Sequence, residues 1–97
     1  MRVKQEQPDE LRTLMNVGPA TRADFTLLGI NTIAQLATQH PDVLYAKLNA
    51  ITRTRHDPCT WDTFAATIHQ AKTGEGKPWW VWTAERKKRQ AAGRFKL

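Results

Sequence analysis

A tight turn between two short helical patterns, within the segment from Leu11 to Gly29, constrains the fold more than any other feature of this chain. Hydrophobic residues recur at helical spacing on both sides of the turn, at Leu11, Leu14, Met15, Phe25, Leu27 and Leu28. Gly18 can adopt a positive φ without penalty, and Pro19 suits the first position of a helix because its φ is fixed. The sequence therefore predicts a helix ending near Met15, a turn through residues 16–18, and a second helix over residues 19–28.

The turn resembles the helix-hairpin-helix motif, in which hydrophobic and glycine positions alternate and a proline commonly follows. The corresponding residues here are Met15, Asn16, Val17, Gly18 and Pro19, so Asn16 replaces the first glycine. The resemblance implies that backbone N–H groups of the hairpin and of the next helix bind a DNA phosphate without reading base sequence. Asn16 would place a side chain where that phosphate approaches. The alternative is that Gly18 and Pro19 only close a helical hairpin.

The composition is that of one soluble globular domain. The chain has 97 residues, of which 40% are hydrophobic and 25% charged, and no apolar run reaches transmembrane length. The N-terminal residues lack the hydrophobic core of a signal peptide. A single cysteine excludes an internal disulfide, so we expect a cytoplasmic protein.

Nearly all of the excess positive charge lies at the C-terminal end. The formal net charge is +6, and residues 73–97 contribute seven basic and two acidic groups, against four and four in residues 1–40. Basicity of this kind favours a nucleic-acid partner, reached through the tail and not through the hairpin.

Local signals outline the middle of the chain. Gly29 is typical of a residue just beyond a helix, with Ile30 making the accompanying hydrophobic contact, and Thr32 with Gln35 fits a capping box. This box predicts a short helix over residues 33–38. A longer helix is expected to begin at Pro41, with an inner face of Val43, Leu44, Leu48 and Ile51.

The segment Ile51–His56 stands where a second hairpin would follow. It contains no glycine, so we expect a degenerate hairpin. Arg53 and Arg55 could reach a second phosphate if this loop faces the same way as the first hairpin. Solvated loop charges are the more common outcome for such residues.

The strongest amphipathic pattern follows Asp57 and Pro58, with Trp61, Phe64, Ala65 and Ile68 at helical spacing. It predicts a central core helix that ends near Lys72, with Gly74 beyond it. We expect a last helix over residues 84–92, capped by Thr83 and stopped by Gly93.

Three tryptophans, Trp79, Trp80 and Trp82, precede that last helix. They could stack on single-stranded bases or fill the core, and the core is favoured in so small a domain. We expect Trp79 or Trp80 to be buried and Trp82 to be the exposed ring.

Cys59 suggests two further kinds of site. It would lie near a helix N-terminus, which lowers a thiol pKa, and His56 could act as its base. A single cysteine is more often a small buried hydrophobe. His56 and Cys59 could also form half of a zinc site, but His40 and His69 lack paired spacing.

Three short stretches, RHDPC at 55–59, PWW at 78–80 and TAERK at 83–87, together with LRTLMNVGPA and GINTIAQL, resemble the pathogenicity-locus family. These are small bacterial helix-hairpin-helix proteins, sometimes labelled mitomycin-resistance proteins. The resemblance covers residues 8–88, and the basic end from Arg89 to Leu97 exceeds it. It implies the fold and a link to DNA.

These observations predict an all-α, tandem helix-hairpin-helix-like (SAM-like) bundle of five or six short helices with a degenerate second hairpin. The tandem domain is expected to cover residues 1–76. A Trp-rich segment, a basic helix and a tail follow over residues 77–97. We expect sequence-independent DNA binding without catalysis, cofactor or metal. A protein-interaction adaptor is the alternative, and a thiol enzyme at Cys59 a distant third. The expected DNA contacts are Asn16, Val17, Gly18, Ala20, Thr21, Arg22, Arg53, Arg55, Lys87, Lys88 and Arg89.

Overall fold

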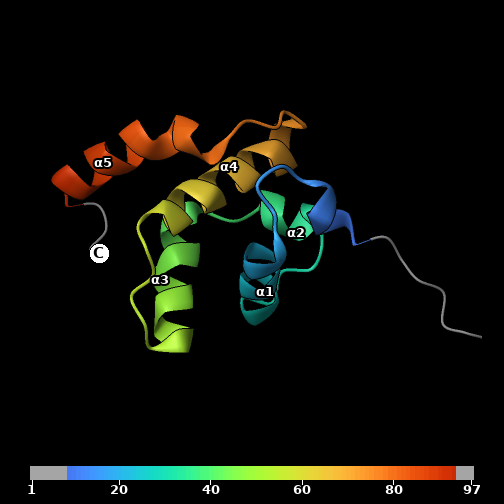
Figure 1. Ribbon diagram of the computed structural model, residues 1–97, viewed down its shortest axis with the longest axis horizontal. Helices are drawn as coiled ribbons and strands as arrows, with labels where there is room; N and C mark the ends of the chain where they lie inside the picture. The colour runs from blue at the N-terminus through green and yellow to red at the C-terminus, as the bar shows by residue number, and fades with distance from the viewer. Residues whose placement is uncertain (1–8, 94–97) are drawn as a thin grey trace, which may run out of the picture.

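The fold is all-helical, as predicted from the sequence. A computed structural model describes residues 9–93, and no strand occurs in that part of the chain (Figure 1). The part of the predicted basic tail beyond Gly93 lies outside the described residues. The elements are η1 (Glu10–Thr13), α1 (Pro19–Leu27), α2 (Ile33–Ala37), α3 (Pro41–Thr52), α4 (Cys59–Thr73), η2 (Trp79–Trp82) and α5 (Thr83–Ala91), where η denotes a 3-10 helix.

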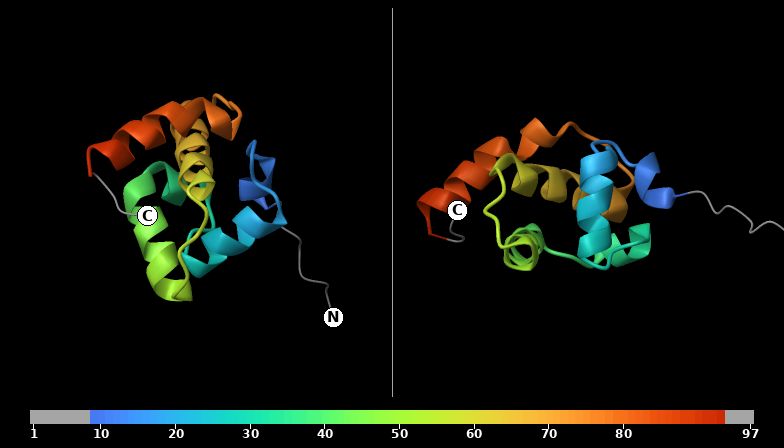
Figure 2. Two further views of the ribbon diagram at one scale, coloured as in Figure 1. Left: turned by 60° about the vertical axis from the view of Figure 1, so that its left-hand side comes forward. Right: turned by 60° about the horizontal axis from the view of Figure 1, so that its bottom comes forward.

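Helix α4 is the central element. It packs against α2, α3, η2 and α5, and Figures 1 and 2 show the other helices arranged around it. Trp61, Phe64 and Ile68 are buried on it, as the periodicity predicts. They belong to one core cluster with the residues expected to face them, Leu14, Leu28, Leu36 and Leu48. The core assignment for this helix is therefore confirmed.

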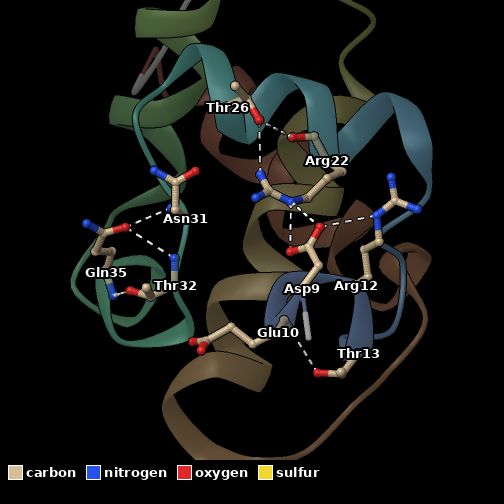
Figure 3. Close-up of polar contacts among 9 residues, drawn as sticks. All are labelled: Asp9, Glu10, Arg12, Thr13, Arg22, Thr26, Asn31, Thr32 and Gln35. Atoms are coloured by element: carbon tan, nitrogen blue, oxygen red, sulfur yellow. Dashed lines mark hydrogen bonds and ion pairs between the residues drawn. The ribbon is translucent and has the colours of Figure 1, made fainter. Parts of the chain in front are cut away.

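Two local signals in the sequence form as expected. The Thr32 hydroxyl accepts from the backbone N–H of Gln35, and the Gln35 side chain accepts from the backbone N–H of Thr32 (Figure 3). After α1, Gly29 adopts a φ of 76° and the N–H of Ile30 donates to the carbonyl of Phe25. This is the Schellman pattern of a helix C-terminus.

The predicted first helix is wrong. Residues 10–13 form only the 3-10 turn η1. In the turn that follows, Asn16 takes the positive φ of 74°, whereas Gly18 is extended, with φ −96° and ψ −174°. The residue before a proline is confined to extended conformations, which explains why the left-handed position moves away from Gly18. The tandem helix-hairpin-helix assignment and the domain division at residue 76 stay predictions.

The predicted inner face of α3 is also partly wrong. Val43 and Ile51 are 54% and 48% exposed, while Leu44 and Leu48 are buried as expected. Tyr45 is buried beside them, and its hydroxyl donates to the carbonyl of His56 at 2.6 Å. The buried face of α3 therefore consists of Leu44, Tyr45 and Leu48. The Tyr45 hydrogen bond joins this helix to the loop that leads into α4.

Two substitutions on α3 distinguish the buried face from the exposed one. Leu48→Ala is expected to cost about 2–5 kcal/mol of unfolding free energy, because it opens a cavity in the core. Ile51→Ala removes a similar amount of side chain from a half-exposed position, so its cost is expected to stay below about 1 kcal/mol. Urea unfolding measures both, and equal losses would contradict the assignment.

Candidate nucleic-acid interface

The predicted hairpin turn is joined to the Trp-rich segment through one side chain. The Asn16 Nδ2 atom donates to the carbonyl of Lys77 at 2.8 Å, and its Oδ1 atom accepts from the N–H of Trp79 at 3.1 Å. Next to it, the N–H of Met15 donates to the side chain of Gln70 at 2.8 Å. Both ends of the Asn16 amide are thus bonded within the protein. The Asn16 side chain therefore links the turn to the Trp-rich segment by two hydrogen bonds.

The N-terminus of α1 is open. Gly18 precedes it without any side-chain cap, and nothing lies within 4 Å of the point that a Cβ at Gly18 would occupy. Gly18 and Ala20 are exposed and Thr21 is half-buried, whereas Val17 packs against the core. Because the first N–H groups of a helix have no acceptor within it, this end offers donors to solvent or to an anion.

Arg22 is an ion-paired residue of the turn region. Its Nε atom lies 2.8 Å from a carboxylate oxygen of Asp9, and Nη1 donates to the Thr26 hydroxyl at 3.1 Å (Figure 3). The hydrogen bond from Arg22 holds the pKa of Asp9 below its ordinary value. The positive charge expected here for a phosphate is therefore balanced by Asp9.

Arg86 and Thr83 join α5 to a buried carboxylate of α4. Asp62 is fully buried and accepts from Arg86 Nε at 2.9 Å and from the Thr83 hydroxyl at 2.7 Å. Arg86 also donates to Gln90 at 3.1 Å. The expectation that Thr83 caps the last helix is wrong, because its hydroxyl is used by Asp62.

Arg89 forms a second connection between α5 and the core. Its guanidinium group pairs with Asp42 at the start of α3 and lies 5.8 Å from the ring centre of Trp61, whose indole N–H also donates to Asp42. Burial alone would raise the pKa of Asp42, but the hydrogen bonds from Arg89 and Trp61 outweigh it and lower that pKa. The neighbouring Lys87 and Lys88 are exposed. The predicted basic cluster is thus divided, with Arg89 facing inward.

The segment predicted as a second hairpin contains the C-terminal end of α3 and the residues that follow it, and it has no glycine. Arg53 adopts a left-handed conformation, with φ 55°, and both Arg53 and Arg55 are exposed. The views agree that this end of α3 lies far from the turn at residues 16–18 (Figures 1 and 2). The two arginines and the first turn therefore belong to separate surfaces.

The expected order of tryptophan exposure is reversed. Trp80 is 61% exposed, whereas Trp82 packs against the core and lies 5.2 Å from the His69 ring. Trp79 is half-buried and meets Trp80 edge to face. Because Trp82 directly precedes α5, the packing of α5 on α4 holds the Trp82 ring against α4.

Cys59 lies in an environment that disfavours its thiolate. Burial first, and then the hydrogen bond and negative charge of Asp57, raise the pKa of the thiol. Asp57 Oδ1 accepts from the N–H of Cys59 at 2.8 Å, and the His56 ring is bonded to Asn49 at 2.8 Å. Within residues 9–93, no group of three or more His, Cys, Asp or Glu side chains is arranged to hold a metal ion.

The fold and this surface define a small all-helical protein with an open helix N-terminus joined to a Trp-rich segment. The chain belongs to the pathogenicity-locus family, whose family model matches residues 4–88. A mitomycin resistance protein, McrB of Streptomyces lavendulae, is 40% identical over 79 residues, which are 81% of this chain and 75% of the relative. No solved structure matches the chain. None of the described helices has the length and apolar character needed to cross a bilayer.

The ion pair at Asp42 predicts a dependence of stability on acid. Because the folded pKa of Asp42 is lowered, its contribution is present above its unfolded pKa of about 3.9 and is lost as the pH falls below that value. Asp42→Asn removes this titration. Unfolding free energies measured between pH 6 and pH 2, with about the same ionic strength throughout, are expected to fall more steeply in the wild-type protein. Parallel curves would contradict this role.

The raised thiol pKa of Cys59 can be measured directly. The pH dependence of alkylation by iodoacetamide is expected to give an apparent pKa above that of an ordinary cysteine, about 8.5. Asp57→Asn keeps a side-chain oxygen that can accept from the N–H of Cys59 and removes the negative charge, so it is expected to lower that apparent pKa. An apparent pKa well below the ordinary value would instead support a reactive thiol.

Proposed function

We propose that this protein binds DNA without reading its base sequence and without catalysis, through the open N-terminus of α1. The observation that carries the proposal is the exposed, uncapped helix start at Gly18, Ala20 and Thr21, with open space over Gly18. A helix start of this kind presents backbone donors and a positive dipole end to a phosphate. Contacts to phosphate carry no base code, so binding would be insensitive to sequence.

The surroundings of this helix start determine which side chains assist. Arg22 and Arg89 are balanced by Asp9 and Asp42, so neither supplies a full net charge. The exposed Lys87 and Lys88 remain as sources of long-range attraction, and Arg53 and Arg55 would act only on a separate stretch of DNA. Affinity is therefore expected to be low, since few phosphates are neutralised.

Trp80 adds an exposed aromatic ring on the segment that Asn16 joins to the turn. It follows Trp79, whose backbone is bonded to Asn16 of the turn, and it is 61% exposed. An exposed indole ring can stack on any unpaired base. We therefore propose that unpaired or single-stranded DNA is preferred over an intact duplex.

The alternative is a protein-interaction adaptor. Trp80, Val81 and Met15 are exposed hydrophobic residues at or next to the segments that Asn16 joins, and exposed apolar surface often marks a protein contact. The mitomycin resistance for which the McrB relative is named does not distinguish the two functions. As part of the same proposal, the protein acts in the cytoplasm, which accords with its single cysteine.

A matched pair of substitutions on α1 tests the phosphate contact. Gly18→Val adds bulk where the backbone is extended and the space is open, so the fold is expected to tolerate it. If a phosphate approaches this point, fluorescence anisotropy with a labelled oligonucleotide will show weaker binding. Ala23→Val adds side-chain bulk on the exposed surface beyond the first turn of the same helix and is expected to bind like the wild type.

The salt dependence of DNA affinity distinguishes the phosphate contact at Gly18 from the long-range attraction by Lys87 and Lys88. Each phosphate neutralised by a Lys or Arg side chain contributes about −0.7 to the slope of log K against log salt on a single strand, whereas an uncharged backbone N–H contact releases no counterion. Replacing both Lys87 and Lys88 with glutamine is expected to reduce the slope, whereas Gly18→Val weakens binding with little change in slope. Unaltered binding by Gly18→Val would remove the helix start from the interface. Absence of binding to single-stranded and duplex DNA at low salt would favour the adaptor.

A further inference from the structure

A second candidate site is a groove beside the central helix. The groove, of about 260 Å³, opens between the start of α3, the middle of α4 and the segment that joins η2 to α5. Ala65 and Ile68 of α4 contribute small and apolar groups to it, and Trp82 of η2 contributes an aromatic ring. The groove shares no lining residue with the turn at residues 16–18.

The formally charged residues of the lining are basic. Lys72 and Arg89 line the groove together with the rings of His40 and His69, and among residues 9–93 no lining residue is acidic. The carboxylates that contact Arg89 and His69 belong to Asp42 and Glu75, which are not among the lining residues. Lys72 is exposed and forms no ion pair with any residue between 9 and 93. Lys72 thus offers a positive charge at the groove that no carboxylate of the described residues pairs with.

The ring of Trp82 gives the groove a flat surface as well as a charge. Trp82 is half-buried, packs against the core and is further held by His69 at a ring separation of 5.2 Å. A ring held in this way loses little freedom when another planar group packs on it. A ligand that matches both features combines a planar aromatic ring with an anionic group.

We propose that this groove binds a single nucleotide, with its base against Trp82 and its phosphate at Lys72. The size of the groove supports one unit, because sites for drug-sized ligands begin at about 300 Å³. The nucleotide can be free in solution or the terminal unit of a DNA strand, since both present the same ring and phosphate. This inference does not depend on a phosphate contact at Gly18.

An NMR titration of the full chain tests the proposal. Adenosine monophosphate is expected to shift the indole N–H signal of Trp82 and the backbone signals near Lys72. Adenosine alone and inorganic phosphate alone are expected to bind at least about tenfold more weakly, because each satisfies only one of the two features. Equal affinity for inorganic phosphate would overturn the proposal, as would shifts confined to other surfaces.

Charge reversal at matched positions provides the second measurement. Lys72→Glu is expected to weaken binding of adenosine monophosphate about tenfold, since it reverses a unit charge close to the phosphate. Lys47→Glu makes the same change at an exposed position of α3 that is absent from the groove and is expected to have little effect. Equal effects of the two variants would indicate general electrostatic attraction and contradict the site.

The same titration distinguishes the two sources of nucleotide. A 5′-phosphorylated oligonucleotide that shifts the Trp82 signal when adenosine monophosphate does not would assign the groove to a strand end. The reverse result would assign it to free nucleotides. If neither probe shifts that signal at about 10 mM, where millimolar affinities would be detected, the groove does not bind nucleotides.

Discussion

The buried carboxylate of Asp62 determines how the C-terminal part of this protein is arranged. Arg86 is the only buried residue that α5 contributes among those described, so the helix is held by charge and hydrogen bonds more than by apolar packing. Removing one partner from such a buried pair typically costs about 3–5 kcal/mol, because the other charge is left uncompensated. Trp82 and Arg89, which line the groove, are positioned by the docking of the same segment.

The parts of the fold that the sequence predicts are those decided within a few residues. The capping box at Thr32 and the buried stripe of Trp61, Phe64 and Ile68 depend on local spacing, and both are confirmed. On α3, spacing alone does not decide between Val43 and Tyr45, because the choice depends on a hydrogen bond to His56 in the next loop. Long-range contacts of this kind leave no periodic signal.

The candidate site also has features that local sequence predicts and features that depend on long-range contacts. The open start of α1 follows from Gly18 and Pro19 in the sequence, although the expected positive φ belongs to Asn16 instead. The positive charge that is available to a binding partner cannot be predicted from residue types alone. Arg89 is balanced by Asp42, which is 47 positions away, and a count of basic residues cannot reveal that pairing. Tertiary structure therefore decides which cations a partner meets.

The presence of Asn16 at the left-handed position of the turn has a consequence for how two distant segments are joined. A glycine would adopt the left-handed backbone more easily, but it could not bond both Lys77 and Trp79. Asn16 adopts the left-handed conformation and also uses both ends of its side-chain amide to bond a segment more than sixty residues away in the sequence. A ligand that displaced this amide would break both of these hydrogen bonds, while Trp82 would still hold the Trp-rich segment against the core.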